Sequence, residues 1–170
     1  MTSKASTPDA DEPAADALKA RAVRLLARRE HSRAELRSKL LRGGGADASA
    51  SHAATVDALL DDLAAGGYLS DARYAQTVVR RKGGAYSAAA IGATLKASGV
   101  PPETVAEALA SRPLDDDEAL RALWSKRFGK PPESDREKAR QVRFLQSRGF
   151  TLSAVLRLLR APPGLDAGES

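Results

Sequence analysis

At 170 residues, of which 42% are hydrophobic and 29% charged, the chain is long enough for one ordinary domain or a short array of small units. It has no cysteine and two histidines, which excludes disulfides and thiolate metal sites and leaves little imidazole for metal binding or catalysis. Aromatic residues make up only 4%, and the apolar residues are mostly Ala, Leu and Val, a composition that favours helices.

The formal net charge of +5 is unevenly distributed, because both ends of the chain are acidic. Residues 18–160 hold 26 basic and 16 acidic residues, a net charge of +10. Such a basic body favours an anionic partner. Residues 1–16 are rich in Ala, Pro, Asp and Ser and predict a disordered tail, and residues 161–170 predict a flexible one. Because no signal peptide or membrane-length apolar run is present, we expect a soluble, cytoplasmic protein.

Helix start and stop signals divide the chain into three units of three short helices each. Ser32 and Glu35 form the pattern of a capping box, and Gly66 with Gly67 is a typical helix end. No alternating strand pattern competes with these helices. The predicted helices are Ala17–Arg29, Arg33–Leu41 and Ala54–Ala65 in unit 17–69; Asp71–Lys82, Ser87–Ala97 and Pro101–Ala110 in unit 70–112; and Asp115–Arg127, Ser134–Arg148 and Leu152–Arg160 in unit 113–160.

An internal repeat supports this division. Residues 19–32 match residues 138–151 without a gap, and seven of the fourteen positions are identical. Ser32, Ser87 and Thr151 are each followed by apolar residues four and eight places later. A hydroxyl residue ahead of such a stripe is typical of an N-capped helix with one buried face. The sequence therefore predicts an all-α fold of three tandem three-helix repeats.

Basic residues recur beside the apolar stripes of these helices. Arginine forms forked hydrogen bonds to phosphate or carboxylate, so the basic faces predict contacts with DNA or with an acidic protein groove. The alternative interpretation is a set of ordinary solvated helix faces. The candidate contact residues are Arg21, Arg24, Arg28, Arg33, Arg37, Lys39, Arg73, Arg80, Arg81, Arg136, Arg140, Arg143 and Arg148.

Other groups that suggest chemistry have simpler interpretations. Asp115 to Glu118 lack the ligand spacing of a calcium loop and favour a helix N-terminus instead. Asp61 and Asp62 are adjacent on a predicted helix and diverge by about 100°, so we expect both to face solvent. His31 has no ligand cluster around it, and we expect it to lie at a helix junction.

The aromatic residues are scattered along the sequence. We expect most of them to belong to the core and not to a stacking surface for bases. They are Tyr68, Tyr74, Tyr86, Trp124, Phe128, Phe144 and Phe150. The sequence contains no phosphate-binding glycine motif, nucleophile elbow or histidine–carboxylate set. We therefore expect no enzyme activity, no metal site and no cofactor.

Three separated segments of the sequence share their motifs with one known family. Residues 28–44 read RREHSRAELRSKLLRGG, residues 59–84 read LLDDLAAGGYLSDARYAQTVVRRKGG with a Gly-Tyr-Leu and an Arg-Tyr-Ala series, and residues 140–159 read RQVRFLQSRGFTLSAVLRLL. In order and spacing they resemble the opening, middle and C-terminal elements of the RecX family, the regulators of the RecA recombinase. One departure is the run Ala88 to Ala90, where family members often carry basic residues, and contacts by that helix are therefore not expected.

The resemblance implies an elongated, curved array of helical repeats that binds the groove of the RecA–DNA filament. It further implies a monomer, with at most weak direct DNA binding, that limits ATP hydrolysis, filament growth and strand exchange in recombination and the SOS response. The alternative class is a stand-alone helical DNA-binding or architectural protein, in which the same arginines neutralise phosphates without RecA.

Overall fold

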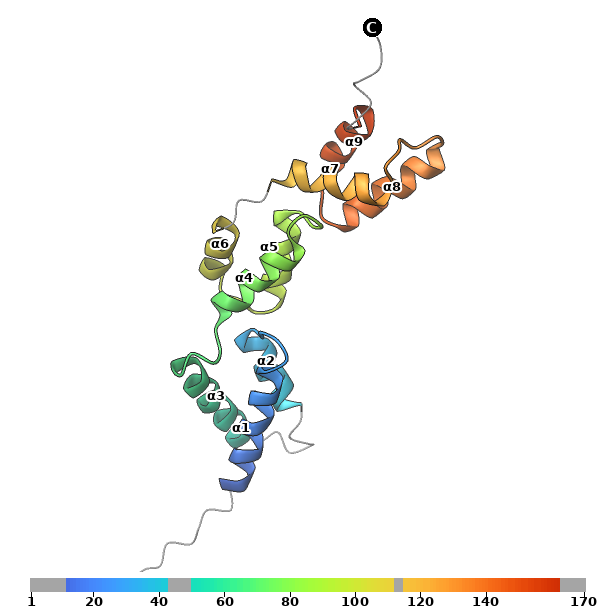
Figure 1. Cartoon of the computed structure of the whole chain (residues 1–170). Helices are drawn as coiled ribbons and strands as arrows, with labels where there is room; N and C mark the ends of the chain where they lie inside the picture. Colours follow the sequence, from blue (N-terminus) through green and yellow to red (C-terminus); the bar gives the residue numbers. More distant parts are fainter. Residues whose placement is uncertain (1–11, 43–49, 112–114, 163–170) are drawn as a thin grey trace, which may run out of the picture. The chain divides into compact units, whose positions relative to one another are not determined.

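A computed structural model describes residues 12–42, 50–111 and 115–162. Within these ranges the chain forms nine α-helices and no strand, apart from one isolated bridge between Gly83 and Tyr86. The helices are α1 (Glu12–Leu26), α2 (Arg33–Leu41), α3 (Ala50–Ala65), α4 (Asp71–Lys82), α5 (Ala88–Ala97), α6 (Pro102–Ala110), α7 (Asp116–Arg127), α8 (Asp135–Ser147) and α9 (Leu152–Arg160) (Figure 1). The predicted all-α fold of three helical triplets is confirmed.

Two helices begin earlier than predicted. α1 begins at Glu12 and not at Ala17, so residues 12–16 are helical and do not belong to a disordered tail. α3 begins at Ala50 and not at Ala54, which shortens the expected Gly43–Ser51 loop. In both places alanines next to the expected start extend the helix, since alanine has the highest helix propensity. The rest of both predicted tails and residues 43–49 lie outside the described residues.

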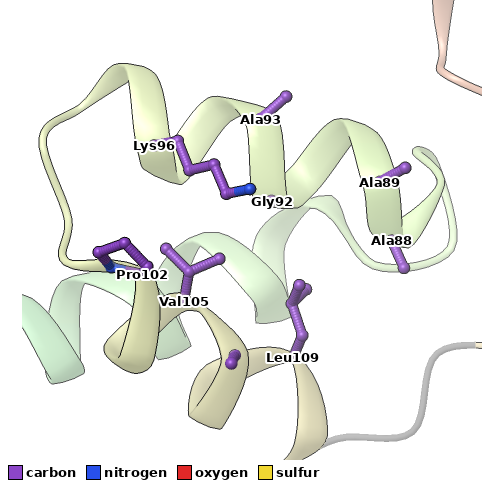
Figure 2. A pocket seen from close by; sticks show the side chains of 9 residues that line it. Ala88, Ala89, Gly92, Ala93, Lys96, Pro102, Val105 and Leu109 are labelled. Atoms are coloured by element: carbon purple, nitrogen blue, oxygen red, sulfur yellow. The ribbon is translucent and has the colours of Figure 1, made fainter.

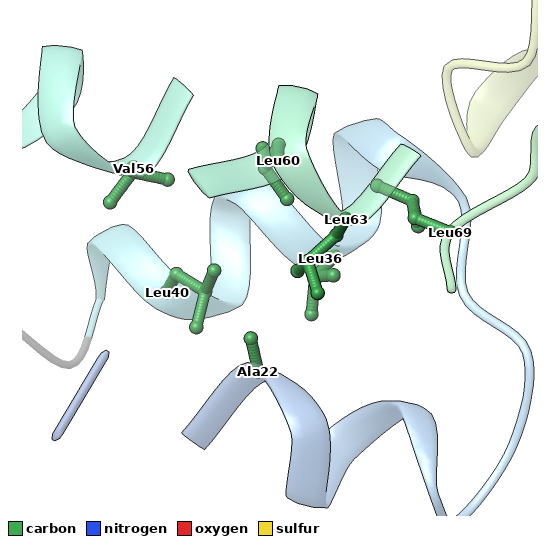
Figure 3. Close-up of a cluster of buried hydrophobic side chains, with 7 residues drawn as sticks. All are labelled: Ala22, Leu36, Leu40, Val56, Leu60, Leu63 and Leu69. Atoms are coloured by element: carbon green, nitrogen blue, oxygen red, sulfur yellow. The ribbon is translucent and has the colours of Figure 1, made fainter. Parts of the chain in front are cut away.

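Contacts between residues divide the structure into two compact units, here called unit 1 and unit 2, which differ from the three helical triplets predicted from the sequence. Among the described residues, unit 1 contains those up to Tyr74 together with Ser98–Val100, and unit 2 contains Ala75–Ala97 and those from Pro101 onward. In unit 1, α2 packs between α1 and α3. Figure 3 shows the resulting core, in which leucines of α2 and α3 meet a small residue of α1. Its buried members are Ala22, Leu36, Leu40, Val56, Leu60, Leu63 and Leu69.

Hydrogen bonds fix the position of the start of α2 relative to the start of α4 and to the turn after α5. Ser32 is fully buried, and its Oγ accepts a hydrogen bond from Glu35 N at 3.0 Å while donating to Ser98 O at 2.5 Å. Arg33 N donates to Asp71 Oδ1 at 2.8 Å. Two of the amides left unpaired at the helix N-terminus are therefore satisfied, one of them by the first residue of α4.

The start of α5, inside unit 2, repeats this arrangement. Ser87 is 1% exposed, and its Oγ accepts from Ala90 N at 3.2 Å and donates to Gly149 O at 2.8 Å. Ala88 N donates to Asp116 Oδ1 at 2.8 Å. The second and third triplets are thus joined at a serine cap that also receives an aspartate from the first helix of the third triplet. Around Trp124, the third triplet has its own core.

The two copies of the internal repeat occupy different positions within their helical triplets. Residues 19–32 lead from the first to the second helix of their triplet, whereas residues 138–151 lead from the second to the third. The structural counterpart of Ser32 and Ser87 is therefore Ser134, which caps α8 through Glu137 N and is exposed. Thr151 does cap a helix as predicted, by accepting from Ala154 N. The predicted helix start at Asp115 is also confirmed, since its carboxylate accepts from Asp117 N and Glu118 N.

Candidate partner-binding surfaces

In unit 1 the candidate residues of α2 are largely neutralised by carboxylates of α3. Arg37 forms a forked pair with Asp57, with Nε and Nη2 at 2.6 and 2.9 Å from the two carboxylate oxygens. This pairing lowers the pKa of Asp57. Arg33 Nη2 lies 2.7 Å from Asp61 Oδ1. The predicted exposure of Asp61 and Asp62 is confirmed, but Asp61 holds one of the arginines assigned to a partner.

Three other candidates in unit 1 also have partners within the unit. Lys39 Nζ lies 3.4 Å from Glu35 Oε1, and Arg73 Nε lies 3.0 Å from Glu30 Oε1. Arg21 Nη2 donates to the carbonyl of Lys39 at 2.9 Å. By contrast, the exposed side chains of Arg24 and Arg28 have no hydrogen bond or ion pair among the described residues. Much of the basic face predicted for unit 1 is therefore compensated internally.

His31 lies at the junction before α2, as predicted, and is 1% exposed. Its Nδ1 is 2.9 Å from Arg29 O and its Nε2 is 3.2 Å from Lys39 Nζ. A neutral ring that donates from Nδ1 and accepts at Nε2 satisfies both contacts. Burial is the main cause of the lowered pKa of His31. The ring is therefore a neutral part of the junction.

Unit 2 brings cations and aromatic rings together in one row. The Lys82 ammonium lies 4.3 Å from the Tyr86 ring centre, and the Arg148 guanidinium lies 4.7 Å from the same centre. Arg148 is also 5.0 Å from the Phe144 ring centre, over which Arg127 lies at 5.8 Å. We call these five residues the cation–aromatic row. They come from the end of α4, the turn after it, α7, and the end of α8.

The row continues along α8. Arg140 is four residues before Phe144, so the two side chains are neighbours on one helix face. Arg140 and the adjacent Arg143 are both exposed and have no partner among the described residues. Arg136 is exposed too and has no ion pair among the described residues, although it shares the first turn of α8 with Asp135 and Glu137. α8 therefore presents three exposed arginines, of which Arg140 and Arg143 lie beyond the acidic first turn.

Further exposed basic residues of unit 2 lie on α4. Arg80 and Arg81 are exposed, and Arg80 Nη2 lies 3.4 Å from Thr77 Oγ1, which makes a weak hydrogen bond. Residues 75–97 contain four basic residues and no carboxylate, and residues 138–162 contain six basic residues and no carboxylate. These two acid-free stretches meet at Lys82, Tyr86 and Arg148.

Sequence reasoning missed Arg127 and the rings of Tyr86 and Phe144 as parts of a surface. Tyr86 and Phe144 are half-buried, whereas Tyr74, Trp124 and Phe150 are buried as expected. Tyr68 is 69% exposed on the turn after α3 and is an exception to the expectation that most of the aromatic residues lie in the core. The spacing of Lys82 to Tyr86 and of Arg140, Phe144 and Arg148, four residues each, was the available signal.

A shallow groove of about 500 Å³ lies between α5 and α6 (Figure 2). Its lining consists of small and aliphatic side chains with one ammonium group, from Lys96. Lys96 is the single ionisable side chain of this lining, and no carboxylate, imidazole or hydroxyl group shares the lining with it as a partner for acid–base or nucleophilic chemistry. Ala88 and Ala89, two residues of the run in which family members often carry basic residues, belong to this lining.

The described residues offer neither a metal cluster nor a membrane span. They hold no group of three or more His, Cys, Asp or Glu side chains placed to bind a metal ion. None of their helices has the length and apolar character needed to cross a membrane. Among the surfaces of the described chain, the cation–aromatic row with Arg140 and Arg143 is therefore the candidate that concentrates uncompensated charge.

Comparisons with known proteins agree on one family. Three family models match in order: RecX, first three-helix domain, at residues 19–53; RecX, second three-helix domain, at residues 70–109; and RecX, third three-helix domain, at residues 115–159. The "Regulatory protein RecX" of Leptothrix cholodnii is 45% identical over 143 residues, which cover 84% of this chain and 87% of that protein. The one of Ralstonia pickettii is 45% identical over 144 residues, covering 84% and 86%.

Solved structures give the same fold. A crystal structure of RecX from Lactobacillus salivarius superposes with a TM-score of 0.59 at 16% identity, covering 86% of this chain and 96% of that one. A second crystal structure of a regulatory protein RecX gives a TM-score of 0.65 at 19% identity, covering 93% and 82%.

Proposed function

The chain belongs to the RecX family, and from this premise we propose that it is a non-enzymatic modulator of RecA that binds the RecA–DNA filament and limits its ATP hydrolysis, growth and strand exchange. Family membership is the observation that carries this proposal. The groove of unit 2 has one lysine amine and no second acid–base group in its lining, which supports a binding role over catalysis. The setting that fits this role is the cytoplasm, with one copy of the chain acting alone.

We propose that the uncompensated arginines make the contact and that the internally paired ones do not. Arg140 and Arg143 are exposed and without partners among the described residues, so they retain their full charge for a phosphate or carboxylate. Arg33 and Arg37 would first have to leave Asp61 and Asp57. Arg24 on α1 and Arg28 in the turn after it are the corresponding uncompensated residues of unit 1.

The test is RecA-catalysed ATP hydrolysis on single-stranded DNA with increasing amounts of this protein. The unaltered chain is expected to reduce the rate, and Arg140→Glu with Arg143→Glu is expected to weaken that reduction about tenfold or more, because two attractive charges become repulsive. Arg33→Glu with Arg37→Glu is the matched control, with the same change in net charge. Unchanged inhibition by the first variant would remove α8 from the proposal, and no effect of the unaltered chain on RecA would remove the function.

The second candidate function is a stand-alone DNA-binding protein, favoured by the same uncompensated cations. Such a protein inhibits RecA only by covering DNA, so its effect disappears when single-stranded DNA is in excess over both proteins. A modulator directed at the filament keeps its effect at the same DNA excess. Measuring the hydrolysis rate across a DNA titration therefore separates the two functions.

A further inference from the structure

We propose that a groove on the third triplet, between the loop that joins α7 to α8 and the end of α9, binds an acidic segment of another protein that also carries aliphatic side chains. The groove holds about 270 Å³ and lies within unit 2. Its lining consists of Pro131, Pro132, Lys138, Leu156, Leu159 and Arg160. This inference goes beyond the proposed function, because the groove is separate from the arginines assigned to the filament.

The groove lies on the other side of α8 from these exposed arginines. At about 100° per residue, Lys138 points about 160° away from Arg140 and about 140° away from Arg143 around the helix. The lining also contains no member of the cation–aromatic row. A ligand in the groove therefore leaves Arg140 and Arg143 open, and both surfaces can be occupied at once.

The first argument is that the apolar side of α9 is wider than its buried face. Val155 and Leu158 are buried in the core of the third triplet, and Leu159 packs partly against that core. Leu152 and Leu156 are one helical turn apart on the adjoining part of the helix, and they remain 47% exposed and half-buried respectively. An aliphatic ligand that covers these leucines removes their surface from water, which favours its binding.

The second argument is the charge of the groove. Lys138 and Arg160 are exposed, and neither has a carboxylate partner among the described residues. Two glutamates that lie near Lys138 in the sequence are engaged elsewhere: Glu133 pairs with Lys130 at 2.9 Å, and Glu137 Oε2 accepts a hydrogen bond from Glu133 N at 2.9 Å. The lining thus holds two cations and no carboxylate. Such a pair of cations favours a ligand that carries carboxylates of its own.

The third argument is that one wall of the groove is stiff. Pro131 and Pro132 are half-buried, and the ring of each proline fixes its φ angle. Hydrogen bonds hold the loop on both sides of the prolines. Gln141 Nε2 donates to Lys130 O at 3.4 Å, and Glu133 N donates to a carboxylate of α8. Because this wall is ordered before binding, it loses little conformational entropy when a ligand is bound.

The composition of the lining favours a peptide over a nucleic-acid strand. Surfaces that bind single strands combine cations with aromatic rings on which bases stack, and no aromatic ring lines this groove. Leucines and prolines beside two cations instead match a peptide segment in which aliphatic residues lie close to Asp or Glu. Electrostatic complementarity at the cations then selects acidic segments over basic ones.

The experiment follows the amide signals of the isotope-labelled full chain by NMR during addition of a peptide of about 12 residues built from Leu-Glu-Glu repeats. The amides of Lys138, Leu156 and Arg160 are expected to shift and to saturate, while those of Arg80 and Arg81 on α4 stay in place. A second peptide with Ser in place of Leu has the same charge and is expected to bind about fivefold more weakly, because it buries no aliphatic surface.

Two charge variants test the cations of the groove. Lys138→Gln with Arg160→Gln is expected to weaken binding of the leucine peptide about tenfold, because both counter-charges are lost. Lys19→Gln with Arg42→Gln is the matched control, since it also removes one lysine and one arginine from exposed positions, but in unit 1. The control is expected to change the affinity less than about twofold, because distant surface charges are screened by salt.

A further pair of variants tests the apolar part of the groove. Leu156→Ser is expected to weaken binding of the leucine peptide about fivefold, and Leu156→Met, which keeps the apolar surface, is expected to retain it. Urea unfolding of each variant, followed through Trp124 in the same triplet, identifies any weakening that arises from unfolding. A variant of the groove that is folded and binds the peptide as tightly as the unaltered chain contradicts the role of its residue.

Four results would overturn the inference. No shift of the groove amides would mean that the groove binds no such peptide, and equal binding of the serine peptide would show a response to net charge alone. Shifts of the same amides by an oligothymidylate of equal length and concentration would assign the groove to nucleic acid. Self-association of the chain in sedimentation, abolished by Leu156→Ser, would make a second copy the occupant. None of these measurements involves RecA, so the proposed function stands or fails separately.

Discussion

Gly149→Ala tests the junction between the second and third triplets, both within unit 2. Gly149 has φ +89, and a Cβ built on it would overlap the Cβ of Ala90 and lie 2.5 Å from Ser87 Oγ. A left-handed conformation costs a non-glycine residue about 1–2 kcal/mol. Overpacking of a close contact adds about 1–3 kcal/mol, so the total expected loss is about 2–5 kcal/mol. This is a large part of the stability of a small domain.

Gly84→Ala is the matched control for the backbone contribution. Gly84 has φ +84, and a Cβ there would have nothing within 4 Å. Its substitution is therefore expected to cost only the conformational part, about 1–2 kcal/mol. The difference between the two variants isolates the overlap with α5. Ala90→Gly in the Gly149→Ala background is expected to recover part of that difference, and a double-mutant cycle separates the recovery from the helix propensity of glycine.

The assay is urea unfolding followed by the fluorescence of Trp124, which is the chain's single tryptophan and is 2% exposed in the third triplet. With a urea dependence of about 1–3 kcal/mol per molar, the midpoint for Gly149→Ala is expected about 1 M below that for Gly84→Ala. Equal midpoints for the two variants would refute the close approach at this junction, as would the absence of any recovery with Ala90→Gly.

Three other substitutions are expected to have distinct effects on urea unfolding. Gly92→Ala in α5 is expected to gain up to about 1 kcal/mol, because its Cβ would meet Leu109 at an ordinary 3.4 Å; a lower midpoint would contradict this. Gln141→Leu is expected to cost about 1–3 kcal/mol, since Trp124 Nε1 donates to Gln141 Oε1 at 2.8 Å in a buried site; an unchanged midpoint would show that the bond contributes nothing. His31→Phe lies in unit 1, so its urea unfolding is followed by far-ultraviolet circular dichroism and not by Trp124 of unit 2; it is expected to reduce the dependence of stability on pH, and identical pH profiles would refute that effect.

The sign for His31 follows from proton linkage. Burial lowers the pKa of His31 below its ordinary 6.5, so the unfolded chain binds a proton more readily than the folded one. The contribution of the neutral ring is fully present above about pH 6.5 and is lost as the pH falls from there to the folded-state pKa. Comparing the urea midpoints at about pH 7.5 and about pH 5.5 measures this loss, which His31→Phe removes.

Local sequence was sufficient to predict the helices and most of their ends. Ser32, Thr151 and Asp115 each cap the helix that follows, as their hydroxyl or carboxylate groups predict. The buried positions Leu36 and Leu40 follow directly from helical spacing. Caps and apolar stripes act within about two helical turns, so their information is contained in neighbouring residues. The early starts of α1 and α3 were missed because alanine-rich segments carry no strong start signal.

Comparison of the sequence with itself did not reveal that the two copies of the repeat occupy different positions in their triplets. Thr151 and Ser32 share a local pattern of basic residues, hydroxyl cap and apolar stripe, but they begin different helices of their triplets. Ser134, the counterpart of Ser32 in the fold, is exposed. By contrast, Ser32 and Ser87 are buried, and each donates a hydrogen bond to a carbonyl in the turn after a later helix, at Ser98 and Gly149. A cap of the same chemistry can therefore serve an internal junction or an open end, and only packing distinguishes them.

The sequence by itself determined an all-helical chain with basic faces, because helix propensity, capping and charge are properties of residues and their near neighbours. Only the tertiary structure decided which cations are free. Arg37 is held by Asp57, 20 residues away in the sequence, and Arg148, at the end of α8, lies over the ring of Tyr86 in the turn after α4. Charge compensation depends on which side chains come within a few ångströms, and that distance is set by how the helices pack.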